Sequence, residues 1–109
     1  MKIVFLDRKT IGEDIDLSGF ERFGEVVIYD YSTSEEVPER VKDADIIVLN
    51  KVLVNESTIG QAKSLKLVCV TATGTNNLDK DYLAQMEWHL HQSLIKMDSE
   101  FIVYWVMAK

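Results

Sequence analysis

A loop containing one glycine has the residue types needed to bind a small anion. Residues 72–79 (ATGTNNLD) follow an apolar run and precede a stretch with helical spacing. Gly74 would let the backbone come close to a ligand, and the free N–H groups at a helix start favour a carboxylate. An ordinary strand-to-helix turn capped by Asn or Asp has the same composition, so local chemistry leaves both interpretations open.

Other side chains with reactive chemistry give weaker signals. The single Cys69 lies inside an apolar run, which favours a small core residue over a nucleophile. His89 and His91 are two residues apart and could start a metal site on a strand. No third ligand is obvious, because Asp98 and Glu100 are equally suited to a helix start. We therefore predict neither a metal site nor a catalytic residue in this chain.

Four apolar runs are the elements that would position the glycine loop. They are mostly continuous rather than alternating, which is typical of strands covered on both faces in a parallel sheet. The runs are residues 2–7, 25–30, 45–50 and 65–71.

Helical signals separate these runs. Residues 17–23 form an apolar-spaced stretch that Gly24 can close, and Ser34 and Asn55 are suitable N-caps for two further helices. Another helix is expected over residues 79–85. The alternation predicts right-handed crossovers and a doubly wound, flavodoxin-like α/β fold. Ligands then bind beyond the carboxyl ends of the strands, at loops 7–10, 30–34, 50–55 and 72–77.

Composition excludes several classes of protein. The 109 residues have a formal net charge of −6 and no cluster of Lys and Arg, which argues against nucleic-acid binding. The apolar start is too short for a signal peptide, and no apolar stretch is long enough to span a bilayer. We expect one hydrophobic core and a cytoplasmic location.

Two motifs at the ends of consecutive predicted strands carry a resemblance. Asn50-Lys51-Val52 ends one run, and Thr-Ala-Thr-Gly-Thr-Asn-Asn-Leu-Asp ends the next, after an opening KIVFLD. Together they resemble the Rossmann-like substrate domain of the D-isomer-specific 2-hydroxyacid dehydrogenases, most closely the glycerate dehydrogenase and hydroxypyruvate reductase branch. The resemblance covers residues 1–85 as a substrate-binding domain and leaves residues 86–109 as a non-matching hydrophobic tail.

The resemblance implies a site for a small 2-hydroxy or 2-oxo acid. In this family the backbone amides of the glycine loop hold the substrate carboxylate, a role that passes to Thr73 and Gly74, with Asn76 beside them. The loop after the preceding strand faces the same cleft, which gives Asn50 and Lys51 a substrate-contacting role. The parent enzyme would transfer a hydride between NAD(H) or NADP(H) and C2 of the substrate.

Features required for that hydride transfer are missing. No G-x-G-x-x-G occurs, because the five glycines are too scattered to hold a pyrophosphate. The family's Arg, carboxylate and His belong to the nucleotide domain and have no counterpart here. We expect the chain to bind no nucleotide cofactor and to be inactive alone. The abrupt change after Gln85 suggests a truncated, frame-shifted or fused reading frame.

The tail ends in an eight-residue apolar run, residues 101–108. Its β-branched and aromatic content favours a strand, whereas Asp98-Ser99-Glu100 is typical of a helix start. So much apolar surface must be buried, in the body or against another chain. We therefore expect a homo-oligomer that forms through the tail.

Two other functions compete with the dehydrogenase fragment. One is a stand-alone small-carboxylate-binding or regulatory α/β domain that uses the Gly74 loop without turnover. The other is a flavodoxin-like receiver or carrier module. A receiver would need an acidic cluster at the end of the first strand, where only Asp7 occurs, and a flavin carrier would need a phosphate loop that the sequence lacks.

Overall fold

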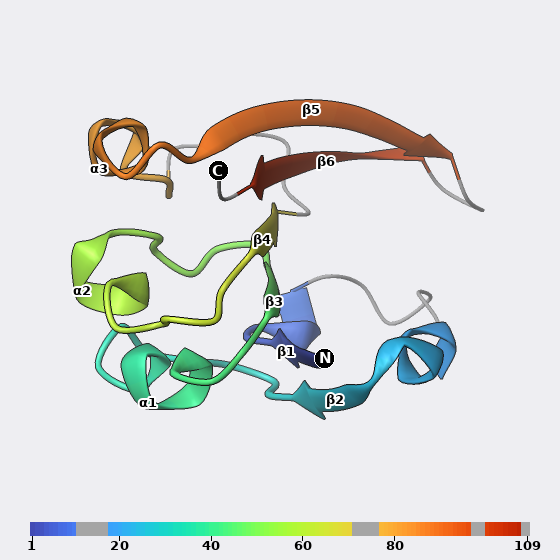
Figure 1. The fold of residues 1–109 in the computed structure, drawn as a ribbon. Helices are drawn as coiled ribbons and strands as arrows, with labels where there is room; N and C mark the ends of the chain where they lie inside the picture. Colours follow the sequence, from blue (N-terminus) through green and yellow to red (C-terminus); the bar gives the residue numbers. More distant parts are fainter. Residues whose placement is uncertain (11–17, 71–76, 97–99, 108–109) are drawn as a thin grey trace.

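Four short parallel strands form one side of a six-stranded sheet in the computed structural model, which describes residues 1–10, 18–70, 77–96 and 100–107 (Figure 1). Their spatial order is β2-β1-β3-β4. The predicted apolar runs are confirmed as strands with shorter bounds: β1 Lys2–Phe5, β2 Glu25–Ile28, β3 Ile46–Leu49 and β4 Leu67–Val70. This order and direction confirm the α/β, flavodoxin-like doubly wound class.

The C-terminal tail adds a long hairpin to this sheet. Strands β5 (His89–Lys96) and β6 (Glu100–Met107) are antiparallel, and β6 pairs with β4 from Leu67 opposite Met107 to Val70 opposite Tyr104. The full order is β2-β1-β3-β4-β6-β5. The described part of the tail therefore forms strands. Because Glu100 begins β6, the helix start suggested by Asp98-Ser99-Glu100 is wrong from Glu100 onward. Strand β6 covers the edge of β4, which leaves β5 and β2 at the two edges of the sheet.

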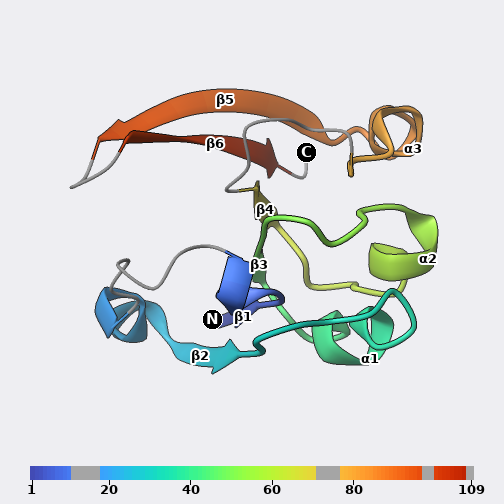
Figure 2. The same cartoon turned by 180° about the vertical axis from the view of Figure 1, so that it is seen from behind.

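Helices lie on both sides of the parallel strands. Helices α1 (Val37–Val41) and α2 (Glu56–Ile59) lie on one side, and the 3-10 helix η2 (Ser18–Phe23) lies on the other, as both views show (Figures 1 and 2). Helix α3 (Lys80–Gln85) leads into the hairpin, and the 3-10 helix η1 (Arg8–Thr10) follows β1. A layer on each side is what the doubly wound interpretation requires.

Of the two predicted N-caps, Asn55 is confirmed and Ser34 is wrong, and Asp79 caps the helix after the glycine loop, where the sequence left Asn or Asp open. The Asn55 side chain accepts from the Thr58 N–H at 3.1 Å, and the Asp79 carboxylate accepts from the Tyr82 N–H at 3.0 Å. Ser34 does not cap α1. Instead, Thr33 and Glu36 exchange hydrogen bonds, since each backbone N–H donates to the side chain of the other. This reciprocal pattern is that of a capping box placed one residue before the predicted cap.

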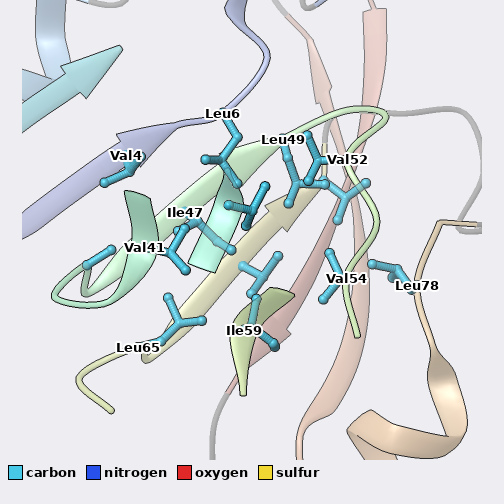
Figure 3. Close-up of a cluster of buried hydrophobic side chains, with 14 of the residues drawn as sticks. Val4, Leu6, Val41, Ile47, Leu49, Val52, Val54, Ile59, Leu65 and Leu78 are labelled. Atoms are coloured by element: carbon cyan, nitrogen blue, oxygen red, sulfur yellow. The ribbon is translucent and has the colours of Figure 1, made fainter. Parts of the chain in front are cut away.

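The larger hydrophobic core lies between the sheet and the helices α1 and α2. Branched aliphatic side chains from the strands and from both helices fill it (Figure 3). Trp88 is half-buried and packs against the same cluster, so the start of the C-terminal tail is packed against the main core. On the opposite face, Phe5 is buried and meets the ring of Phe20 edge-on at 5.3 Å between centroids.

Candidate functional site

The carboxyl ends of the parallel strands lie at one end of the sheet, and three loops come together there. The chain leaves β1 toward β2 on one side, while β3 lies on the other side of β1. The point between β1 and β3 is therefore the topological switch point, where open α/β sheets bind their ligands. The segments that follow β1 and β3, together with the segment after residue 76, form this candidate site.

Asp7 is the central residue of the switch point. It lies two residues after the end of β1 at Phe5 and is only 3% exposed. Its two carboxylate oxygens accept one hydrogen bond each from backbone N–H groups: Oδ1 from Asn50 at 2.9 Å and Oδ2 from Lys51 at 2.7 Å. Burial of a carboxylate is costly unless such donors compensate it. Asp7 therefore fixes the turn after β3 to the end of β1.

Asn50 ties this turn to the neighbouring loop. Its side-chain Nδ2 donates to the carbonyl of Thr10 at 2.9 Å, and its own carbonyl accepts from the Asn77 side chain at 3.3 Å. With its N–H already bound to Asp7, Asn50 is half-buried and largely engaged within the protein. Its Oδ1 accepts no hydrogen bond from the residues that the structure describes.

Lys51 differs from Asn50 in that, among the described residues, its backbone is held but its side chain is not. Its backbone N–H is held by Asp7, whereas its side chain is exposed and forms no ion pair within the described part of the chain. Its ammonium group lies at the carboxyl ends of the strands, on a backbone that is fixed in place. Such a positive charge attracts an anionic ligand. The structure thus brings the predicted pair Asn50 and Lys51 to the switch point.

Asn77 fixes the end of the glycine loop. Its Nδ2 donates to the carbonyl of Val52 at 2.8 Å, and its backbone carbonyl accepts from the Val54 N–H at 2.8 Å. The Asp79 N–H then donates to the Val54 carbonyl at 2.9 Å, and Val54 and Leu78 form a parallel bridge. The sequence placed Asn77 in the loop without a role. The partners of its side chain, 25 and 27 residues away, give no local signal.

The predicted ligand-binding residues Thr73, Gly74 and Asn76 lie outside the described residues. The described residues on either side are Val70, at the carboxyl end of β4, and Asn77, which is bound to the 50–54 segment.

The loop after β2 is held by Arg40. Its guanidinium group donates to the Tyr31 carbonyl and to Ser32 Oγ, both at 2.7 Å, and lies 4.0 Å from the centre of the Tyr29 ring. Ser32 Oγ in turn donates to the Leu6 carbonyl at 2.7 Å. Arg40 also pairs with Glu36, whose pKa is lowered chiefly by its hydrogen bonds from Thr33 and further by the Arg40 charge. Arg40 therefore has a structural role.

The N–H groups of the turn after β3 already donate to the Asp7 carboxylate, so a pyrophosphate there would meet a negative charge instead of free donors. Gly19, Gly24 and Gly60 do not lie at the carboxyl end of a strand.

Three further observations limit the chemistry of the described residues. Burial raises the pKa of the Cys69 thiol to about 11, so it is protonated at neutral pH and is a poor nucleophile. Within the described ranges, no group of three or more His, Cys, Asp and Glu side chains is arranged to hold a metal ion. Likewise, none of the helices described is long and apolar enough to cross a membrane.

Known proteins with similar sequences are dehydrogenases. A protein of Haemophilus influenzae, named as a 2-hydroxyacid dehydrogenase, is 44% identical over 81 residues, which are 72% of this chain and 25% of that protein. The glycerate dehydrogenase of Methylorubrum extorquens is 40% identical over 80 residues, with the same two shares. The chain therefore spans about a quarter of the length of these relatives.

A solved structure extends this similarity to the fold. The 3-phosphoglycerate dehydrogenase of Entamoeba histolytica, solved with NAD+ bound, superposes with a TM-score of 0.65 and 31% identity over 78% of this chain and 30% of that one. The family model for the D-isomer specific 2-hydroxyacid dehydrogenase catalytic domain matches residues 3–87. The resemblance read from the two loop motifs is thus confirmed, and the chain belongs to the D-isomer-specific 2-hydroxyacid dehydrogenase family.

Proposed function

We propose that the chain is the substrate-binding part of an NAD-dependent oxidoreductase that acts on the CH–OH group of small D-2-hydroxy acids similar to glycerate. The observation that carries the proposal is the junction at the switch point, where Asp7, Asn50 and Asn77 fix three loops and leave the Lys51 ammonium exposed. The family membership and the NAD+ bound to the Entamoeba relative support it.

The roles of individual residues follow from this proposal. The Thr73 and Gly74 amides hold the substrate carboxylate, with Asn76 beside them. Lys51 supplies a positive charge, and Asn50 offers its Oδ1 as an acceptor for a substrate hydroxyl group. Residues 1–85 act as the substrate-binding domain, and residues 86–109 as a tail outside the family pattern.

We further propose that these 109 residues do not catalyse hydride transfer by themselves. A dinucleotide needs free backbone donors at a helix start, whereas the described turn after β3 is not a helix start and its Asn50 and Lys51 N–H groups donate to Asp7. NAD would supply the hydride chemistry when bound by a separate domain, and this chain would bind and orient the acid. Turnover and binding are thus separable properties.

The test is an assay of the purified chain with NADH and hydroxypyruvate. We expect no NADH oxidation and no energy transfer from tryptophan to bound NADH. A chain purified from a host strain that lacks its own hydroxypyruvate reductases serves to exclude contamination. Turnover by such a preparation would contradict the proposed division of roles.

A stand-alone carboxylate-binding domain is the second candidate function. The observation that favours it is the pairing of β6 with β4, which completes the sheet without another domain. Under this alternative, affinity for a small carboxylate would be as high in the chain alone as in a full-length relative. Under the first proposal it would be much weaker, at millimolar strength or above, because closure of a second domain is missing.

We also propose that the chain self-associates through the tail. Strand β5 lies at the outer edge of the sheet, eight residues long and without proline or glycine, and such edges pair readily with another copy. Light scattering should give a dimer or a larger assembly. A chain that ends at Gln85 should be monomeric or insoluble, and a soluble dimer of that shorter chain would rule out the tail as the interface.

A further inference from the structure

The carboxylate of Asp7 is buried. It is nearly inaccessible to solvent, and its two oxygens accept hydrogen bonds from the N–H groups of Asn50 and Lys51. Its own carbonyl is also occupied, because it accepts from the Thr10 N–H at 2.9 Å and from Thr10 Oγ1 at 2.8 Å. Asp7 can therefore act on a ligand only through the residues that it holds.

A continuous series of hydrogen bonds runs from Asp7 to the glycine loop. Asp7 holds the N–H groups of Asn50 and Lys51, and the Asn50 carbonyl accepts from Asn77. Asn77 is the first described residue after the loop of residues 71–76. Each contact joins segments at least 25 residues apart in the sequence, so no local turn could replace it.

We propose that Asp7 is a positioning residue for the turn of Asn50 and Lys51, the described part of the proposed ligand site. Its side-chain oxygens hold the turn that carries the Lys51 side chain and that Asn77 contacts, so ligand affinity depends on Asp7 although Asp7 does not touch the ligand. The proposal rests on the proposed function, since it concerns the same site.

The chemistry predicts that Asn cannot replace Asp7, although the two side chains have the same shape. Asn has one acceptor oxygen and one NH2 group, so one of the two backbone donors would face another donor. Leaving such a buried donor unsatisfied is unfavourable, and the turn should move to relieve it. The Asp7→Asn variant therefore changes the hydrogen bonding while it keeps the volume.

Asp45 offers a matched control at the opposite end of the parallel strands. Its carboxylate accepts one hydrogen bond from the Lys2 backbone N–H at 2.7 Å, just before β3 begins. Asp45→Asn removes a carboxylate from a similar bond to a backbone donor, but far from the switch point. It separates a general loss of stability from a specific effect on the site.

The first arm of the experiment uses no ligand. Amide spectra of the isotope-labelled chain are compared with those of Asp7→Asn and Asp45→Asn. We expect Asp7→Asn to shift the amides of Asn50, Lys51 and Asn77 most, and Asp45→Asn to shift those around Lys2. Unmoved amides at residues 50 and 51 in the Asp7→Asn spectrum would overturn the positioning role.

The second arm titrates the three proteins with sodium glycolate. We expect affinity to fall about tenfold or more in Asp7→Asn, equivalent to at least about 1.4 kcal/mol, and to stay within about twofold in Asp45→Asn. Equal affinities in the unaltered chain and in Asp7→Asn would overturn the proposal alone. Absence of binding by the unaltered chain would overturn the proposed function, and the first arm would still decide whether Asp7 shapes the turn.

Asp7→Asn carries a risk of not folding, and two further measurements cover that case. In the unaltered chain, scalar couplings across the hydrogen bonds should join the Asn50 and Lys51 amide nitrogens to the Asp7 carboxyl carbon, and their absence would overturn the proposal. The glycolate titration then moves to Asn77→Ala, which interrupts the same series of bonds one step later. Unchanged glycolate affinity in that variant would also count against the proposal.

Discussion

Replacing Asn77 with Ala should destabilise the protein by breaking the link between the glycine loop and the turn after β3. Two side-chain hydrogen bonds are lost, at 2.8 Å to the Val52 carbonyl and at 3.3 Å to the Asn50 carbonyl. A typical net contribution is about 1 kcal/mol for each bond, and the longer bond contributes less. The expected loss is thus about 1–2 kcal/mol, or about 4–9 °C in Tm for a chain of this size.

The assay is urea unfolding followed by tryptophan fluorescence, because Trp88 is half-buried against the main core. Asn77→Asp provides a sharper comparison, since it keeps the shape but turns an acceptor toward both carbonyl groups. It should be less stable than Asn77→Ala. Gln61→Ala, at an exposed position, is the neutral control and should stay within about 0.5 kcal/mol. The reasoning is refuted if Asn77→Ala matches this control, or if Asn77→Asp is as stable as the unaltered chain.

Three further predictions follow from described contacts. Gly24→Ala should cost about 2–3 kcal/mol by thermal unfolding, because Gly24 has a φ of +143° and an added Cβ would lie 2.0 Å from the Met1 carbonyl oxygen; an unchanged Tm would contradict this. Asn55→Ala should cost about 1 kcal/mol in urea unfolding through loss of its bond from the Thr58 N–H, and an unchanged unfolding midpoint would contradict this. Since burial raises the Cys69 pKa to about 11, the unfolded thiol ionises first as pH rises, and stability relative to Cys69→Ala should be full below pH 9 and fall between pH 9 and about 11; a pH-independent difference would contradict this.

The parallel strands could be predicted because their signal is local. Continuous runs such as IIVL at β3 need burial on both faces, and the structure provides a helix layer on each side. The caps at Asn55 and Asp79 are also local, because each bonds within three residues. The Ser34 cap was wrong because the Thr33 and Glu36 pair, also local, satisfies the spacing of a capping box and competes for the same turn.

The remaining features depend on contacts that are distant in sequence. The apolar tail is compatible with a strand or a helix, and pairing with β4, more than 30 residues earlier in the chain, resolves it as a strand. Asp7 looked like an isolated acid at the end of the first strand, because its partners are 43 and 44 residues away. The sequence placed Asn50 and Lys51 at the carboxyl ends of the strands. It could not show that their backbone N–H groups donate to Asp7.

The most direct test of the proposed substrate-binding role is an NMR titration of the unaltered chain with D-glycerate. The account predicts weak, saturable binding at millimolar strength, with the first and largest shifts at the amides of Thr73, Gly74 and Asn76 and a smaller response at Lys51. Sodium chloride at the same ionic strength is the control for nonspecific anion effects. Shifts confined to the tail or to Lys63, or equal shifts with chloride, would contradict the account.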